Sequence, residues 1–438
     1  MISAEMTDFN EACRYIEDAA RLGSRPGLDR IRMLCDLLGN PEDKLRFIHI
    51  AGTNGKGSTA AMIASALKCA GVRVGMYYSP ALSGIKDHYM IDGQLISDED
   101  YTKAISRVAD ANEKLIEGTG ESATQFELET AVAFSYFAEN HCDVVVCECG
   151  MGGLEDATNV IKNKLCCVIA SVSFDHMQYL GNTLTEIARA KAGIIIEGCP
   201  AVALDSNEEV IEEIRKRCSI TGSRLYIVEP DEIIYSPDDD GCINVSYNDL
   251  RDVKVGLAGS YQAENAALAL QTLSVISDSG CFGHGVPDEK AIRSGLANVS
   301  WPFRFEKISS EPLIYVDGAH NADAAVKLLR TIKERLEGFD IILVMAMFAD
   351  KEVEKVVNTL APYAKKVIVT QTKDNIRALD ADELSVIVRK YCGHVTVRKD
   401  IKEAYALAEE ECKKHERAAV VACGSLSYLN DFKNGKSR

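Results

Sequence analysis

The sequence lacks any apolar run long enough to cross a bilayer, and its opening stretch, MISAEMTDFNEAC, has no basic segment followed by an apolar one. These absences argue against a membrane protein and a secretory signal peptide, so we expect a cytoplasmic location. Positive charge is also scarce, because 49 Lys and Arg stand against 66 Asp and Glu, for a formal net charge of −17. This deficit argues against nucleic acid or an anionic membrane as the main partner.

The 15 cysteines are odd in number and include no C-x-x-C pair. The close spacings of Cys147 with Cys149 and of Cys166 with Cys167 suit neither a structural zinc site nor a disulfide framework. We therefore expect buried free thiols in a reducing compartment.

No internal repeat or low-complexity tract is present, and short apolar runs alternate with segments long enough for a helix. This alternation predicts an α/β fold with mostly parallel sheets. A helix is expected after Thr124, which forms a capping-box pattern with Glu127 before Phe126, Thr130, Phe134 and Phe137 recur at helical spacing. We expect these aromatic residues to be mainly core. The expected strands lie in 44–51, 72–79, 143–150, 165–174, 312–320, 340–348, 365–372 and 417–425.

A chain of 438 residues is longer than a single domain with one hydrophobic core usually is, which favours two domains. We expect a P-loop-containing domain over 1–298 and a smaller, Rossmann-like α/β domain over 299–438. The segment 297–306, with the only Trp and a Pro, is the expected junction. The less regular stretch 220–258 suggests a small hairpin-like insertion.

The stretch HIAGTNGKGST, residues 49–59, is typical of a phosphate-binding loop. Glycines follow the expected strand and a largely apolar helix follows the glycines, an arrangement that directs backbone N–H groups at phosphate. Lys56 would add a positive charge. The general motif places Ser or Thr directly after the lysine, whereas here Gly57 intervenes before Ser58 and Thr59. The alternative is a turn that binds nothing, in which a lysine would gain nothing from packing.

Three polar residues lie at the carboxyl ends of other expected strands, namely Ser79, Glu148 and His176. Ligands of open parallel sheets bind at the carboxyl ends of the strands, so these side chains could converge near a triphosphate and hold a divalent cation. Each has a simpler interpretation: Ser79 as a turn residue before Pro80, and His176 as a hydrogen-bonded surface histidine. Their shared position favours the functional interpretation.

Several motifs together resemble one family. GTNGKGST, YYSPAL, DATN, FDHMQYLGNTLTEIARAKAGI, GSYQAENAALAL and DGAHN occur in the order typical of folylpolyglutamate and dihydrofolate synthases, a branch of the Mur ligase superfamily. The resemblance extends from Pro26 to the ACGSLSYL segment near the end of the chain. It implies an ATP-binding central domain, a C-terminal glutamate ligase domain, and an ATP-dependent amide ligase that adds L-glutamate to a folate-type carboxylate through an acyl phosphate. Dihydrofolate synthase activity, two Mg²⁺ ions, a monovalent cation such as K⁺ and a monomeric state belong to the same expectation.

The resemblance also assigns residues. The nucleotide would be held by Gly52, Thr53, Asn54, Gly55, Lys56, Gly57, Ser58, Thr59, Asn265, Arg304, Asp317 and His320. The magnesium ligands would be Ser58, Ser79, Glu148, His176 and a carbamylated Lys191. Catalysis would involve Lys56, Lys191, His176, Arg304 and His320, and the acceptor would contact Thr124, Phe126, Asp156 and Ala157. From the residues alone, Lys191 would be an ordinary exposed helix lysine.

The sequence departs from the family pattern on the substrate side. Ala81 replaces a histidine, and Leu154 and His88 stand where the pattern has arginines. Ala190 replaces a glutamate, and Phe303 precedes Arg304 where the pattern has glycine. Two alternatives therefore stay open: a related ligase that joins an amino acid to a non-folate carboxylate, and an ATP-binding regulatory protein without turnover. A P-loop kinase is a further, less favoured class.

Overall fold

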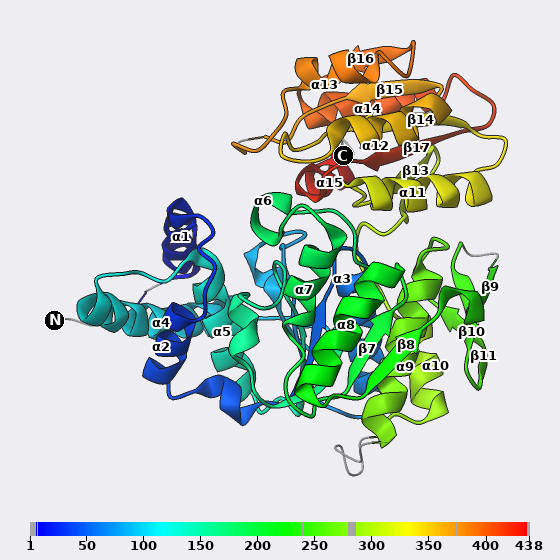
Figure 1. The fold of residues 1–438 in the computed structure, drawn as a ribbon. Coiled ribbons are helices and arrows are strands. Elements are labelled where there is room, and N and C mark those ends of the chain that lie inside the picture. The colour runs from blue at the N-terminus through cyan, green and yellow to red at the C-terminus, as the bar shows by residue number, and fades with distance from the viewer. Residues whose placement is uncertain (1–5, 7, 239–240, 279–285, 374, 436–438) are drawn as a thin grey trace. The chain divides into compact units, whose positions relative to one another are not determined.

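The computed structural model describes residues 6, 8–238, 241–278, 286–373 and 375–435 (Figure 1). The chain divides into two compact units. The first comprises Met1–Ile234, Val245–Lys254 and Glu264–Val299, and the second comprises Tyr235–Asn244, Val255–Ala263 and Ser300–Arg438.

The first unit contains an eight-stranded sheet with the order β4-β3-β2-β5-β1-β6-β7-β8. The strands from β2 to β8 in this order pair in parallel, while β3 and β4 add an antiparallel edge. The expected strands of this half correspond to β1, β2, β5 and β6, whereas β3, β4 and β7 were not expected. The bounds are β1 Phe47–Ala51, β2 Val74–Tyr77, β3 Tyr89–Ile91, β4 Gln94–Leu95, β5 Val144–Glu148, β6 Lys164–Ile169, β7 Ala201–Leu204 and β8 Leu225–Val228.

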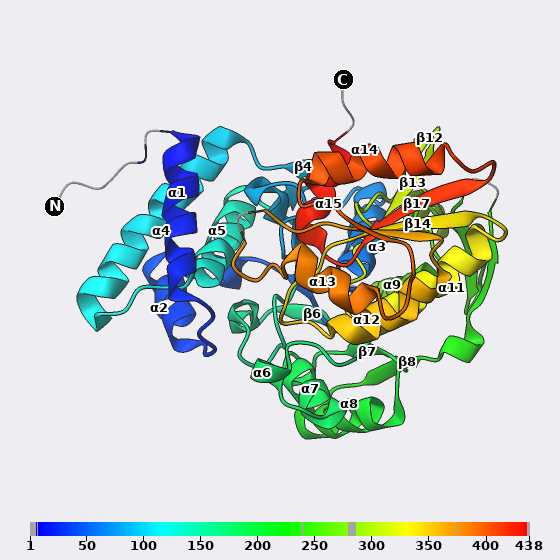
Figure 2. The same ribbon diagram turned by 90° about the horizontal axis from the view of Figure 1, so that it is seen from above.

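Helices cover both faces of this sheet. Helices α1, α2, α4 and α5 pack against one another, as both views show (Figures 1 and 2), and α7 packs against α8. Helix α3 packs closely on α10, where the Ser65 hydroxyl donates to the Gly295 carbonyl at 2.7 Å. The bounds are α1 Phe9–Ala19, α2 Asp29–Leu37, α3 Lys56–Cys69, α4 Asp98–Thr119, α5 Gln125–Glu139, α6 Met177–Leu180, α7 Leu184–Ala192, α8 Glu208–Thr221, α9 Gln262–Asp278 and α10 Glu289–Ala297.

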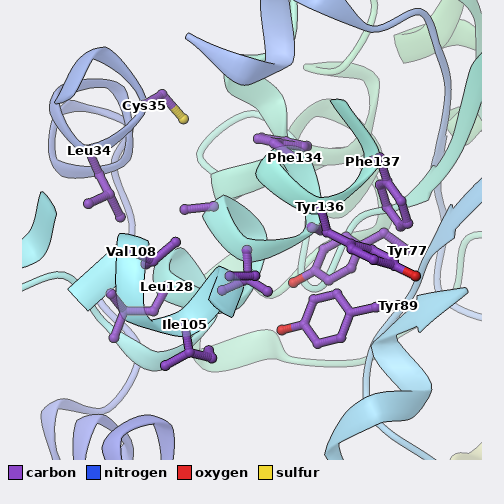
Figure 3. Close-up of a cluster of buried hydrophobic side chains, with 14 of the residues drawn as sticks. Leu34, Cys35, Tyr77, Tyr89, Ile105, Val108, Leu128, Phe134, Tyr136 and Phe137 are labelled. Carbon is purple, nitrogen blue, oxygen red and sulfur yellow. The ribbon is translucent and has the colours of Figure 1, made fainter. Parts of the chain in front are cut away.

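The capping box expected at the start of α5 is present. The Glu127 backbone N–H donates to the Thr124 hydroxyl, and the Glu127 carboxylate accepts from the Thr124 backbone N–H. Phe134 and Phe137 of this helix are fully buried, as expected for core residues. Figure 3 shows them in one cluster with side chains from α2, α4 and the β2–β3 edge, including Leu34, Cys35, Ile105, Val108, Tyr77 and Tyr89.

The stretch 220–258 is more regular than expected. Its first part completes α8 and supplies β8, the edge strand of the large sheet. The prediction that an insertion begins at residue 220 is therefore wrong for this part of the stretch. The remainder forms a three-stranded sheet with the order β11-β10-β9. Strands β10 and β11 are neighbours joined through Asn248 and Asp249, which is the hairpin suggested by the sequence. The bounds are β9 Ile234–Pro237, β10 Ile243–Tyr247 and β11 Leu250–Val255.

The second unit contains a six-stranded sheet with the order β12-β13-β17-β14-β15-β16, parallel except for β12. Its four expected strand segments correspond to β13, β14, β15 and β17. Helices α11, α12 and α13 contribute to the apolar core on one face, and α14 packs against β14, β17 and α15. The bounds are β12 Glu306–Ser310, β13 Leu313–Val316, β14 Asp340–Met345, β15 Lys366–Val369, β16 Val395–Val397, β17 Ala418–Cys423, α11 Ala322–Arg335, α12 Val353–Leu360, α13 Ala381–Val388, α14 Ile401–Cys412 and α15 Leu426–Lys433.

Helix hydropathy and the state of the cysteines can both be examined in the structure. Among the described residues, none of the helices combines the length and the apolar character needed to cross a bilayer. The cysteines within the described ranges are free thiols and most are buried, as expected.

Candidate active site

The glycine-rich loop, residues 52–59, connects β1 to α3. Gly55 has φ 87° directly before α3, and a Cβ there would overlap the Asn265 amide oxygen. Gly52 has φ 153°, and a Cβ there would lie 2.8 Å from the Cβ of Ala170. Only glycine adopts these positive φ angles and fits these close contacts without strain. The close approach also places Asn265, on α9, against the glycine-rich loop.

A matched pair of substitutions tests this close approach. Gly55→Ala should weaken nucleotide binding by about tenfold or more, because the added methyl group must displace Asn265 or shift the loop. Gly71→Ala is the control, since Gly71 has a similar φ of 83° but nothing within 4 Å of a Cβ. Nucleotide titration by calorimetry measures both. Equal affinity of the two variants would contradict a role for this contact.

Lys56 and Glu148 form an ion pair beneath the loop. Lys56 Nζ lies 3.4 Å from Glu148 Oε1 and donates to the Thr53 carbonyl at 3.4 Å. Glu148 is the last residue of β5 and its side chain is only 7% exposed. A buried carboxylate is costly unless a cation compensates it. The pair therefore places one negative and one positive group at the carboxyl end of the sheet. Nearby, the Thr59 hydroxyl is buried without a hydrogen-bond partner within the described ranges.

Lys191 is buried, so its interpretation as an exposed helix lysine is wrong. It lies on α7 and is 3% exposed, and its Nζ donates to the Gly52 carbonyl at 2.7 Å. Burial, and secondarily the charge of Lys56, lowers the pKa of Lys191 to about 7. A large fraction of this amine is therefore neutral and nucleophilic near neutral pH.

Ser79 and His176 lie after their strands rather than within them. Ser79 follows β2 by two residues and is half-buried. His176 precedes α6, seven residues after the end of β6, and its Nε2 lies 4.0 Å from Asp175 Oδ2. No group of three or more His, Cys, Asp or Glu side chains in the described parts of the chain is arranged to hold a metal. The expected set differs from such a group, because it combines Glu148 and His176 with hydroxyls and Lys191.

The expected acceptor residues lie at the start of α5 and at the turn Ala157–Val160. The Phe126 ring packs against Gly150 and stacks on Tyr77 with centroids 6.2 Å apart. Asp156, with a pKa raised by burial, accepts from the Met151 N–H at 2.8 Å and from the Thr158 N–H at 3.0 Å. Asp156 therefore holds the backbone of the segment between β5 and this turn.

The second unit brings together Arg304, Asp317 and His320. Buried Asp317 follows β13 and accepts from the Tyr261 hydroxyl at 2.8 Å and from the Phe305 N–H at 2.9 Å. Burial raises the pKa of Asp317, and the Arg304 charge opposes this rise. A Cβ on Gly318 would overlap the Arg304 guanidinium, and His320 Nδ1 lies 2.8 Å from the Gly318 carbonyl.

Two residues beside Arg304 have left-handed backbones, Phe303 with φ 59° and Phe305 with φ 45°. Such conformations are costly for aromatic residues and persist only where surrounding contacts enforce them. Here the Phe305 N–H is bound by Asp317, so the acid fixes the segment that presents Arg304. The sequence did not single out Tyr261, although it lies in the GSYQAEN motif.

Two family models match the chain: the Mur ligase middle domain over residues 50–273 and the Mur ligase, glutamate ligase domain over residues 303–426. A Bacillus subtilis dihydrofolate synthase/folylpolyglutamate synthase is 33% identical over 98% of this chain and 99% of its own length. The structure of a Mycobacterium tuberculosis folylpolyglutamate synthase complexed with ADP and AMPPCP is similar with a TM-score of 0.89 and 30% identity, over 98% of this chain and 100% of that one. An Escherichia coli FolC in complex with DHPP and ADP is similar with a TM-score of 0.84 and 26% identity, over 98% of each chain.

Proposed function

The chain belongs to the Mur ligase family, in the branch of the folylpolyglutamate and dihydrofolate synthases, and from this membership we propose how its own residues serve the reaction. It is an ATP-dependent ligase that joins L-glutamate to a folate-type carboxylate through an acyl phosphate. The observation that carries most weight is Lys191, a buried lysine of lowered pKa held against the Gly52 carbonyl. If the glycine-rich loop only connected a strand to a helix, a buried amine from α7 against the Gly52 carbonyl would have no role in a reaction.

The reaction requires control of negative charge. A carboxylate oxygen of the acceptor attacks the γ-phosphorus, and ADP leaves. The amino nitrogen of glutamate then attacks the acyl carbon, phosphate leaves, and the nitrogen loses a proton. Because two anions meet in the first step, positive groups must surround them. Lys56 and the N–H groups at the start of α3 would do this, and the proposal is supported by the position of Asn265 against the loop.

The residues around Glu148 fit Mg²⁺, which prefers oxygen ligands. The buried Glu148 carboxylate, the hydroxyls of Ser58 and Ser79, and a carbamate on Lys191 would supply oxygens, and His176 would add a nitrogen. When bound, the ion would neutralise phosphate oxygens. Two Mg²⁺ ions, a monovalent cation such as K⁺ and a monomeric protein are part of this proposal.

In the second unit, Arg304 would offset the charge that develops on the transferred phosphoryl group. Asp317 acts as a positioning residue, because it holds the backbone on one side of Arg304. Asp317 and His320 complete the proposed nucleotide contacts of this unit.

A related ligase acting on a non-folate carboxylate is the second candidate. Two positions where the family pattern has arginines support this candidate. His88 directs its Nδ1 at the Tyr78 carbonyl, 2.6 Å away, and Leu154 is an exposed apolar residue. Neither can make the contacts of an arginine. A regulatory protein without turnover is less favoured, since binding alone would not need a buried Lys191.

The reaction itself is the test of the proposed function. Incubation with ATP, Mg²⁺, L-glutamate and dihydropteroate or tetrahydrofolate should give ADP, phosphate and an acceptor heavier by one glutamyl group, detected by mass spectrometry. Nucleotide binding without ADP formation across a panel of acids would favour the regulatory protein. A phosphorylated acceptor without an amide would indicate a kinase instead.

A further inference from the structure

Tyr261 lies directly before α9 and binds the carboxylate that holds the backbone beside Arg304. Its side chain is partly buried, and its hydroxyl donates to Asp317 Oδ2 at 2.8 Å. Burial, and secondarily the charge of Asp317, raises the pKa of Tyr261 well above its usual value. The hydroxyl therefore keeps its proton and acts as a permanent donor to a buried carboxylate.

The turn before α9 sets the direction of the Tyr261 ring. Gly259 has φ 101°, and a Cβ there would lie 2.7 Å from a carbon of the Tyr261 ring. The Gln262 N–H donates to the Gly259 carbonyl at 3.0 Å and closes the turn around Tyr261. A larger residue at position 259 would displace the ring, so this backbone directs the hydroxyl at Asp317.

Asp317 connects this hydroxyl to the backbone beside Arg304. Oδ2, the oxygen that accepts from Tyr261, also accepts from the Phe305 N–H at 2.9 Å, while Oδ1 accepts from the Ala319 N–H at 2.9 Å. Asp317 is 4% exposed, so solvent cannot readily replace a lost partner. Loss of the hydroxyl would leave Oδ2 with one hydrogen bond fewer and would free the carboxylate to turn.

The segment that carries Arg304 depends on such contacts, because its backbone is strained on both sides of the arginine. Phe303 has φ 59°; its N–H donates to Glu306 Oε2 at 3.0 Å, and its carbonyl accepts from the Gly318 N–H at 2.8 Å. Phe305 has φ 45°, and its N–H is held by the carboxylate described above. A change at that carboxylate would therefore reach the residue next to Arg304.

We propose that the Tyr261 hydroxyl is a positioning group for the ligase reaction, which acts through Asp317 to fix the backbone that carries Arg304. The inference rests on the proposed function, in which Arg304 offsets the charge that develops on the transferred phosphoryl group. In this role Tyr261 contacts neither the nucleotide nor the acceptor. Its loss should therefore slow the chemical step more than it weakens ATP binding.

Tyr261→Phe removes the hydroxyl and keeps the ring, and it is tested in the full chain with ATP, Mg²⁺, L-glutamate and dihydropteroate. We expect kcat for acceptor-dependent ADP release to fall by about tenfold and the KM for ATP to change by less than about twofold. The reason is that a misplaced cation loses more interaction with the transition state than with bound ATP.

Tyr428→Phe is the matched control in the same unit. Tyr428 is fully buried, and its hydroxyl donates to the carbonyls of Val344 and Cys423 at 2.9 and 2.8 Å instead of to Asp317. Loss of these hydrogen bonds should lower the unfolding temperature while kcat stays within about twofold of the wild-type value. The control therefore separates a general loss of stability from a specific loss of rate.

A double-mutant cycle tests whether the hydroxyl acts through Arg304. Arg304→Ala alone should lower kcat by about 100-fold or more, because the charge of the transferred group is no longer offset. Adding Tyr261→Phe to Arg304→Ala should lower kcat by less than about twofold further, because the group that the hydroxyl positions is already absent. A purely structural role of Tyr261 would instead lower kcat by the same factor in both backgrounds.

The outcomes distinguish this inference from the proposed function. Wild-type kcat in Tyr261→Phe, or a tenfold loss that persists in the Arg304→Ala background, would overturn the positioning role and leave the ligase function standing. A change confined to the KM for ATP would also overturn it, because Tyr261 would then contact the nucleotide. A wild-type protein that binds ATP and forms no ADP with any acceptor would overturn the proposed function and the inference with it.

Discussion

Replacing Lys56 with alanine is expected to lower ATP turnover by about 10³-fold or more, because the variant loses the cation that we propose faces the phosphates in the first step. Lys56 Nζ lies 3.4 Å from Glu148 Oε1, so the substitution also leaves a buried carboxylate without its cation. Negative charge would then increase where the γ-phosphate and the acceptor must meet. The measurement is acceptor-dependent release of ADP.

The control for this prediction is Lys68→Ala on the same helix. Lys68 is exposed in the last turn of α3, so its removal changes the net charge equally while the glycine-rich loop is left intact. Lys56→Arg is informative as well, since guanidinium keeps the charge but spreads it over a planar fork. Wild-type turnover in Lys56→Ala, with an unchanged unfolding temperature, would show that this loop does not serve the reaction.

The glycine-rich loop was predictable from the sequence because its requirements are local. An apolar strand, glycines and an apolar helix follow one another within a short segment, and the structure shows that segment as β1, the loop and α3. The carboxyl-end position of Glu148 was predictable for the same reason. The strands β3 and β4 were missed because they have only three and two residues, whereas β7 is as long as the predicted β2 and its length does not explain why it was missed.

The burial of Lys191 could not be predicted from its neighbours. The segment around it predicts a helix, but the face of that helix that becomes buried depends on β1, about 140 residues earlier in the chain. Its partner is the Gly52 carbonyl, which lies outside any local pattern. Long-range contacts of this kind also fix Tyr261 on Asp317, from segments 56 positions apart.

The substrate-side departures have structural consequences that the sequence did not reveal. Asp87 is 6% exposed, and it accepts from the Leu82 N–H at 3.1 Å and from the Ser83 hydroxyl at 3.0 Å. His88 binds the Tyr78 carbonyl at the other end of the same segment. The segment after β2 is therefore held by its own hydrogen bonds through Asp87 and His88, and it carries no arginine.

Lys191→Ala is expected to lower activity by roughly 100-fold, because it removes the group that would carry the carbamate oxygens. The lowered pKa of Lys191, about 7, sets the pH dependence of this step. Below pH 7 the amine is mostly protonated and cannot attack CO₂, whereas above pH 7 it is mostly neutral and forms the carbamate with release of a proton. The wild-type protein should therefore lose activity when CO₂ is stripped, recover it with bicarbonate above pH 7, and recover less below it.

Samples stripped of CO₂ and samples restored with bicarbonate distinguish a carbamate on Lys191 from a positively charged Lys191. If Lys191 acts as an ammonium group, activity should increase as the pH falls through 7 and should not respond to bicarbonate, because protonation then creates the active form. Intact-mass measurement should show one added CO₂ in the wild-type protein and none in Lys191→Ala. Lys216→Ala is the control, since Lys216 lies on α8 with a side chain 56% exposed, and this variant should keep both the added mass and the bicarbonate response.

Small carboxylates such as acetate should partly restore the activity of Lys191→Ala, because they supply the missing oxygens in the space left by the side chain. Activity of Lys191→Ala equal to that of the wild type, or a wild-type protein indifferent to bicarbonate at pH 8, would rule out the carbamate.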